Sequence, residues 1–103
     1  MDTKTLSLPK LNQLSPTLES TALKLMEETG ELAQVIGKFR GLSGEIVNMD
    51  NDTIIREIAR ELLDVAQTAV TMMFVLEDEF GINIDSAVQD HVSKLERKGY
   101  LSR

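Results

Sequence analysis

The sequence predicts an all-α fold, a small helical bundle. Two long stretches carry apolar side chains at alternating spacings of four and three residues, which is the period of an amphipathic helix. Capping residues and glycines stand where such helices would begin and end. No convincing strand is present, since Ile82, Asn83 and Ile84 form too short a run to found a sheet.

A first helix is expected to begin at Ser15 and Pro16. A serine side chain satisfies an unpaired N–H group at a helix start, and proline suits the first helical position. The helix should run to Phe39 or Arg40, and its apolar stripe comprises Leu18, Ala22, Leu25, Thr29, Leu32, Ile36 and Phe39. We expect residues 1–14 to be loosely ordered and residues 41–51, with two glycines and a polar run, to form a connection.

A second helix should start at a capping residue between Asp50 and Thr53 and end near Phe80, where Gly81 provides a left-handed stop. Its stripe comprises Ile55, Ile58, Leu62, Val65, Ala69, Met72 and Leu76. At 1.5 Å per residue this helix is about 40 Å long, too long to be covered by the rest of so small a chain. Asp85 is the expected cap of a third helix, which stops at Gly99.

Composition narrows the class of protein. The 103 residues should form a single domain, residues 1–103, with a thin core, because a chain of this size buries only somewhat more than ~60% of its unfolded surface. The absence of cysteine excludes disulfides and thiolate sites and fits a cytoplasmic location. The net charge of −6 argues against binding a nucleic-acid polymer, and no apolar run is long enough for a membrane span.

Five acidic residues in two tight groups are the most informative feature. Glu27, Glu28 and Glu31 form the first group, and Glu61 and Asp64 form the second. A spacing of three residues places the last two members of the first group on one helical face, and it does the same for the second group. Four carboxylates arranged in this way indicate a bound cation.

The two groups fall at matching heptad positions. With the apolar stripes taken as core positions a and d, Glu28 and Glu61 are both at g, and Glu31 and Asp64 are both at c. Short connections favour antiparallel neighbours, in which equivalent flanking positions face each other across the seam. We therefore expect the acids of the first helix to look toward those of the second.

Ordinary ion pairs are the simpler alternative. Opposite charges four residues apart contribute ~0.2–0.5 kcal/mol each, and the candidates are Lys24 with Glu28 and Arg60 with Asp64. Like charges at the same spacing repel by a similar amount, and such pairs are Glu27 with Glu31 and Glu57 with Glu61. Because this repulsion recurs on both helices, a hard divalent cation is the expected partner.

Ligand type selects the cation. All-carboxylate sites suit Mg²⁺ or Mn²⁺, whereas zinc favours histidine or cysteine and a di-iron bundle needs Glu-x-x-His pairs. The single histidine, His91, has Val88 three residues before it. A calcium loop is disfavoured because the acids lie in helices. Since Mg²⁺ commonly takes substrate phosphates as further ligands, the pattern indicates phosphate-ester or phosphoanhydride chemistry.

The runs Glu27-Glu28-Thr29-Gly30-Glu31-Leu32-Ala33 and Glu61-Leu62-Leu63-Asp64-Val65 resemble the EExxE and ExxD signature of the MazG-like, all-α nucleoside triphosphate pyrophosphohydrolases. The resemblance extends over about residues 16–100. It implies a homodimer or homotetramer in which helices of two chains complete four-helix bundles. It also implies Mg²⁺-dependent hydrolysis of a (deoxy)nucleoside triphosphate between the α and β phosphates, with Mn²⁺ as a substitute cation.

The resemblance also assigns roles by position. The metal ligands would be Glu28, Glu31, Glu61 and Asp64, while Glu27 would orient or deprotonate water. Charge building on the leaving pyrophosphate calls for basic side chains; the substrate-binding candidates are Lys38, Lys94, Arg97 and, for stacking on a base, Tyr100. Each also has a structural alternative, because cations favour helix C-termini and the tyrosine suits a helix contact.

Two rival functions are left open. The first is a non-catalytic acidic helical dimer that acts as an interaction module. The second is a related Mg²⁺-dependent hydrolase of dUTP, dUDP or phosphoribosyl-ATP. A substrate panel separates the second rival from the implied activity.

Overall fold

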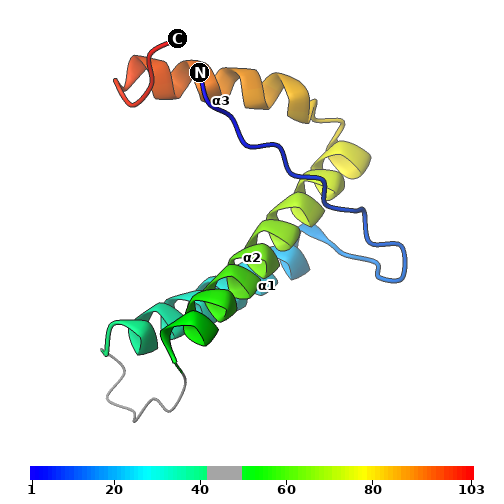
Figure 1. Cartoon of the computed structure of the whole chain (residues 1–103). Helices are drawn as coiled ribbons and strands as arrows, with labels where there is room; N and C mark the ends of the chain where they lie inside the picture. Colours follow the sequence, from blue (N-terminus) through cyan, green and yellow to red (C-terminus); the bar gives the residue numbers. More distant parts are fainter. Residues whose placement is uncertain (42–49) are drawn as a thin grey trace.

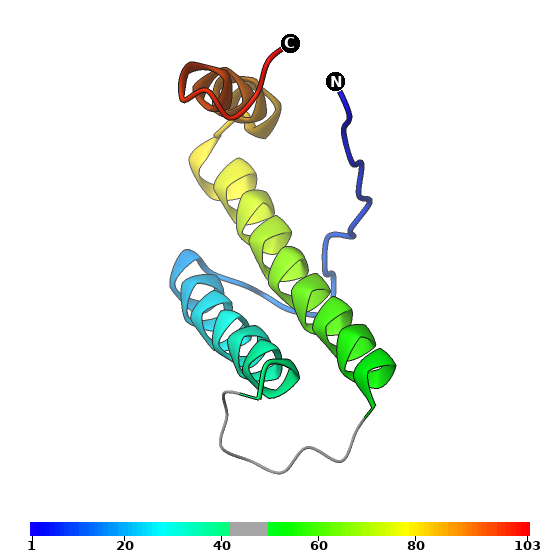
Figure 2. The same ribbon diagram turned by 60° about the vertical axis from the view of Figure 1, so that its left-hand side comes forward.

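The computed structural model describes residues 1–41 and 50–103, and regular structure in these ranges is entirely helical. The helices are α1 (Leu18–Phe39), α2 (Asn51–Phe80) and α3 (Ile84–Arg97). α1 and α2 run antiparallel and side by side, whereas α3 turns away beyond the end of α2 (Figures 1 and 2). The predicted all-α fold is confirmed. Most of the predicted connection, residues 42–49, lies outside the described residues, and within the described ones no helix is long and apolar enough to cross a membrane.

α1 begins at a capping box formed by Thr17 and Ser20. The Thr17 hydroxyl accepts a hydrogen bond from the Ser20 N–H (3.0 Å), and the Ser20 hydroxyl accepts one from the Thr17 N–H (2.8 Å). The predicted cap at Ser15 is therefore wrong, because the reciprocal box satisfies two backbone donors where a lone serine satisfies one. α1 ends at Phe39, as predicted.

The ends of the other helices follow the predicted residue types. The Asp50 carboxylate caps α2 by accepting a first-turn N–H at 2.7 Å, and this hydrogen bond lowers the pKa of Asp50. Gly81 ends α2 in the left-handed region (φ +66°), which glycine adopts without strain. The cap of α3 is Asn83 and not Asp85, because the Asn83 side chain accepts a first-turn N–H at 2.9 Å and leaves Asp85 inside the first turn.

The faces that α1 and α2 turn toward each other are rotated from the predicted stripes. The buried residues are Thr21, Glu28 and Val35 on α1 and Ile54, Thr68, Thr71 and Val75 on α2. None of them belongs to a predicted stripe, and the predicted core residues Ile55 and Leu62 are about half exposed (50% and 53%). The heptad assignment was therefore wrong for Glu28, which lies in the seam and not at its flank. The single chain leaves part of the predicted stripes uncovered, including Ile36, Ile55 and Leu62.

The core shared by α1 and α2 is thin. Among the described residues, the buried apolar side chains are Val35, Ile54 and Val75. The radius of gyration is 16.8 Å, compared with about 13 Å for a compact domain of this length. Large apolar side chains remain exposed on the paired helices, among them Leu23, Met26, Leu62, Leu63 and Met73. One chain alone therefore leaves uncovered much of the apolar surface that a compact domain would bury.

The segment before α1 runs beside α2 without regular structure (Figures 1 and 2). Gln67 Nε2 donates a hydrogen bond to the Pro9 carbonyl at 3.0 Å. Lys10 forms an ion pair with Asp78 and lies 5.6 Å from the centre of the Phe74 ring. These contacts attach Pro9 and Lys10 to α2, and the loose ordering of residues 1–14 stays a prediction.

Candidate metal centre

Glu28 and Glu61 come together in the seam between α1 and α2. Glu28 lies seven residues from each of the other two buried residues of α1, and Glu61 lies seven residues from Ile54 and from Thr68. Residues seven apart share one face of a paired helix. Only 6% of Glu28 is exposed, and Glu61 is half-buried. Each helix therefore directs one carboxylate into the contact face that its neighbours bury.

Glu31 completes a group of three carboxylates. Each of Glu28, Glu31 and Glu61 offers one oxygen atom, and these atoms lie within 4.8 Å of one another. We call this group the carboxylate cluster. Burial decreases from Glu28 through Glu61 to Glu31, which is exposed. Oxygen donors of this kind are the ligands that Mg²⁺ and Mn²⁺ prefer, so the cluster has the chemistry of a hard-cation site.

Two buried oxygens of the carboxylate cluster have no hydrogen-bond partner among the described residues. They are the Oε2 atoms of Glu28 and Glu61. The other oxygen of Glu28, Oε1, pairs with Lys24 Nζ at 3.0 Å, which confirms one of the ordinary ion pairs expected from the sequence. A buried anionic oxygen without a partner is destabilising. A divalent cation would satisfy both oxygens, so the residues present fit Mg²⁺.

The close approach of these acids alters their affinity for protons. The negative charge of Glu28 is the main cause of a raised pKa for Glu31, and desolvation and the charges of Glu61 and Glu27 add to it. The pKa of Lys24 is also raised, chiefly by its hydrogen bond to Glu28. The carboxylate cluster is thus a region of excess negative charge that Lys24 offsets only in part.

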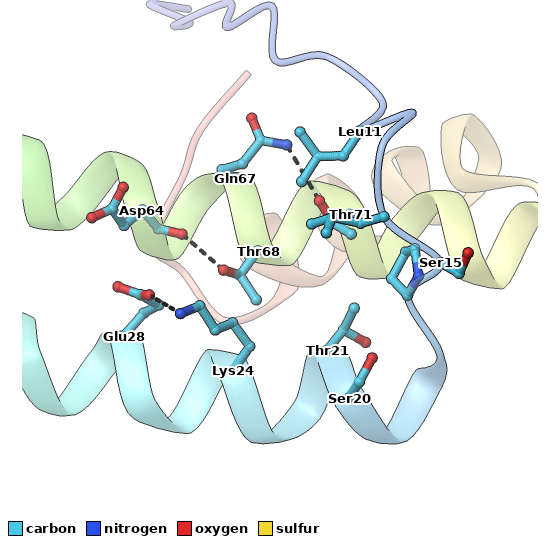
Figure 3. A pocket seen from close by; sticks show the side chains of 12 residues that line it. Leu11, Ser15, Ser20, Thr21, Lys24, Glu28, Asp64, Gln67, Thr68 and Thr71 are labelled. Carbon is cyan, nitrogen blue, oxygen red and sulfur yellow. Dashed lines mark hydrogen bonds and ion pairs between the residues drawn. The ribbon is translucent and has the colours of Figure 1, made fainter.

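Asp64 and Glu27 lie beside the carboxylate cluster but not within it. Asp64 is exposed, and its side chain stands across the seam from Glu28 at the edge of a cavity (Figure 3). Glu27 is exposed and lies 3.7 Å from Lys24. The structure therefore brings together three of the four predicted ligands and leaves Asp64 at the rim. Within residues 50–103, the alternative ion pair of Arg60 with Asp64 is not formed.

The predicted substrate-binding residues lie away from the carboxylate cluster in this single chain. Lys38 is in the last turn of α1, about 10 Å along the helix axis from Glu31. Lys94 and Arg97 are in the last turn of α3, and the exposed Tyr100 follows them. Because α3 turns away from the α1–α2 pair (Figure 1), one chain does not bring these three side chains to its own cluster.

A cavity of about 430 Å³ opens beside the carboxylate cluster, between α1, α2 and the segment before α1 (Figure 3). Glu28 and Asp64 line one part of it, and the other lining residues are Leu11, Leu14, Ser15, Pro16, Ser20, Thr21, Lys24, Gln67, Thr68 and Thr71. Sequence reasoning named none of this second set as site residues. The available signal was the pair Thr68 and Thr71, three residues apart on one face of α2, whereas nothing in the sequence marks Leu11, Leu14 or Gln67.

The paired helices α1 and α2 of this all-α chain bring together three carboxylates, which is the kind of donor set that a hard cation prefers. Comparison with protein families makes the class specific: the model of the MazG nucleotide pyrophosphohydrolase domain matches residues 16–99. The match spans α1, α2 and α3, and the chain belongs to this family. Membership supports nucleotide pyrophosphohydrolase activity at the level of the family. No curated protein and no solved structure matches the chain significantly.

Proposed function

We propose that the protein hydrolyses a (deoxy)nucleoside triphosphate between the α and β phosphates and releases the monophosphate and pyrophosphate. The reaction depends on Mg²⁺, for which Mn²⁺ can substitute, and the proposed ligands are Glu28, Glu31, Glu61 and Asp64. The observation that carries the proposal is the pair of buried, unpartnered oxygens on Glu28 and Glu61 within one carboxylate cluster. Family membership supports the class of reaction.

The proposed ligands differ in exposure, and we assign them different roles on this basis. The enclosed Glu28 and the half-buried Glu61 fix the position of the site, while the exposed Glu31 and Asp64 lie toward solvent, where substrate arrives. Bound Mg²⁺ would offset the charge of the polyphosphate and activate the attacking water. We assign to the exposed Glu27 the orientation or deprotonation of that water. A covalent enzyme intermediate is not part of the proposal, and no cysteine nucleophile exists in the sequence.

Contacts to the leaving pyrophosphate are proposed for Lys38, Lys94 and Arg97, and stacking on the base for Tyr100, because developing charge needs cationic partners. Since α3 turns away from its own carboxylate cluster, the last three residues would act from a second copy of the chain. We therefore propose a homodimer or homotetramer. The exposed apolar side chains of α1 and α2 support this assembly.

The substrate is proposed to be a free nucleotide and not a nucleic-acid polymer, since the net charge of −6 opposes binding to an extended phosphate backbone. The cysteine-free composition favours the cytoplasm as the place of action. Related substrates of the same chemistry, dUTP and phosphoribosyl-ATP, belong in any test of specificity.

A non-catalytic acidic dimer acting as an interaction module is the second candidate. The Lys24–Glu28 ion pair favours it, because this pair already satisfies one oxygen of the most buried acid. Under this alternative Mg²⁺ leaves the melting temperature unchanged. A metal site instead raises the melting temperature by mass action.

A triphosphate panel tests the proposed function. The purified protein is incubated with Mg²⁺ and each canonical ribo- and deoxyribonucleoside triphosphate, several modified ones, dUTP and phosphoribosyl-ATP, and the products are separated. We expect a monophosphate and pyrophosphate from at least one substrate, and no turnover in EDTA. Release of a diphosphate and orthophosphate would place the cleavage at another bond and contradict the proposal.

A further inference from the structure

The cavity beside the carboxylate cluster has two chemically different ends. Glu28 and Asp64 stand at the end next to the cluster, and Leu11 of the segment before α1 stands away from them (Figure 3). Leu14 and Pro16 of the same segment also line the cavity. At about 430 Å³ the cavity falls in the size range of small-molecule sites. A substrate held by its phosphates at the carboxylate cluster would therefore find room for its remaining part in this cavity.

The cavity suits an uncharged group and not a phosphate. The cationic side chain among its described lining residues is Lys24, which is paired with Glu28 at 3.0 Å. The Thr21 hydroxyl donates to the carbonyls of Thr17 (2.9 Å) and Leu18 (3.0 Å), so its proton is engaged by the helix backbone. The Thr68 hydroxyl likewise donates to the Asp64 carbonyl at 2.9 Å. These threonines therefore offer methyl groups and acceptor oxygens without a free hydroxyl proton, which suits an uncharged group.

The segment before α1, which supplies Leu11 and Leu14 as the outer wall of the cavity, is attached to α2 by specific contacts. Gln67 Nε2 donates to the Pro9 carbonyl at 3.0 Å and to the Thr71 hydroxyl at 3.3 Å. Gln67 therefore connects the segment before α1 to Thr71 of α2, which also lines the cavity. The ion pair of Lys10 with Asp78 fixes the same stretch one residue further along the chain. The family match begins only at residue 16. Leu11 and Leu14 therefore lie outside the part of the chain that the family model matches.

We propose that this cavity binds the nucleoside part of the substrate, that Leu11 and Leu14 form its outer wall, and that Gln67 is a positioning residue that holds the wall in place. The inference rests on the proposed function, because the carboxylate cluster must hold the phosphates for the nucleoside to enter the cavity. Its consequence is that affinity for the nucleoside depends on residues outside the family domain. Affinity for the phosphates does not depend on these residues.

Binding measurements separate the two ends of the site. The probes are nucleoside monophosphates, which carry the nucleoside, and inorganic pyrophosphate, which lacks it, both titrated by calorimetry in Mg²⁺. For the double variant Leu11→Ala/Leu14→Ala we expect at least a ~10-fold weaker Kd for the monophosphate that binds wild type best and a pyrophosphate Kd within about twofold. The matched control is Leu6→Ala/Leu8→Ala, which removes two leucines of the same segment that do not line the cavity. It should change neither affinity.

Gln67→Met tests the positioning role, because it removes the amide and keeps the length of the side chain. We expect it to raise KM for the triphosphate several-fold, with kcat within about threefold, and to weaken monophosphate binding but not pyrophosphate binding. A merely structural role would lower both affinities together with the melting temperature, which is measured for every variant. That result would overturn the role of Gln67.

The inference is overturned if wild type binds no monophosphate, if the Leu11→Ala/Leu14→Ala variant binds monophosphates as wild type does, or if it loses both probes equally. Failure of the proposed function looks different. In that case wild type hydrolyses no triphosphate, and the calorimetric comparison of the two probes still decides whether the cavity binds the nucleoside.

Discussion

Glu28 of α1 and Glu61 of α2 face the same helix seam, and each has a buried carboxylate oxygen without a hydrogen-bond partner among the described residues. Only three buried apolar side chains in the described residues support the contact between these helices. The two charges therefore oppose the association of α1 and α2 unless a cation joins them. This relationship connects the stability of the chain to its proposed chemistry.

Glu61→Gln removes one of these charges at nearly constant volume. We expect turnover to fall at least ~100-fold, since even indirect disturbance of metal ligands costs 10- to 100-fold. In EDTA the variant should be no less stable than wild type, because a repulsive charge is lost, and Mg²⁺ should no longer raise its melting temperature. The matched control is Glu77→Gln, an exposed position on the same helix outside the carboxylate cluster. Retained activity in Glu61→Gln would remove this residue from the site.

The raised pKa of Glu31 predicts a pH dependence of stability in the absence of metal. The folded chain holds this proton more tightly than the unfolded chain, so the contribution of Glu31 to stability is present below its ordinary pKa of 4.5 and is lost as the pH rises through the raised value. The Glu31→Gln variant has no titrating carboxyl group at this position, so it does not show this fall in stability. Thermal denaturation in EDTA should therefore show the variant gaining stability relative to wild type as the pH rises from about 4.5, and a difference independent of pH would contradict the expectation.

The capping box at the start of α1 predicts a local effect on stability. Thr17→Ala removes an acceptor for a helix N–H and should lower the free energy of unfolding by ~0.5–2 kcal/mol. Ser15→Ala should change it by much less, because the Ser15 side chain does not cap the helix. Chemical denaturation of the two variants compares them directly. An equal loss of unfolding free energy in both variants would contradict the assignment of Thr17 as the cap.

The uncovered face of α2 predicts self-association. Leu62 is 53% exposed in the single chain, and burying a leucine in an interface contributes about 1.5–3 kcal/mol. Leu62→Glu should therefore raise the dissociation constant of the proposed assembly at least ~10-fold in sedimentation experiments. Leu6→Glu, an exposed leucine before α1, should leave it unchanged. Identical sedimentation of all three proteins would place the interface elsewhere.

Much of the fold follows from local sequence signals. Apolar periodicity located α1 and α2, and Gly81 marked the end of α2 because glycine adopts the required left-handed conformation without strain. The caps of α1 and α3 were misplaced by two residues, from Ser15 to Thr17 and from Asp85 to Asn83. Several neighbouring side chains are competent to cap, and backbone geometry selects among them.

The approach of acids from α1 and α2 was predictable from the sequence, whereas the helical face on which they meet was not. Spacing along each helix identified the acids that three-dimensional packing brings together, namely Glu28, Glu31 and Glu61. The inward face of α1 comprises Thr21, Glu28 and Val35, which apolar periodicity does not mark, so the burial of Glu28 was not foreseen. The wall formed by Leu11 and Leu14 was also missed, because it depends on contacts over long sequence separations such as Gln67 to Pro9.

Anomalous scattering from Mn²⁺ tests most directly whether the carboxylate cluster binds a divalent cation. Crystals of the protein are grown with Mn²⁺ and a non-hydrolysable triphosphate analogue, and data are collected at the manganese edge. We expect an anomalous peak within about 2.0–2.3 Å of carboxylate oxygens of Glu28, Glu31 and Glu61, and no such peak in Glu61→Gln. A wild-type map without a peak at these three residues would contradict the account.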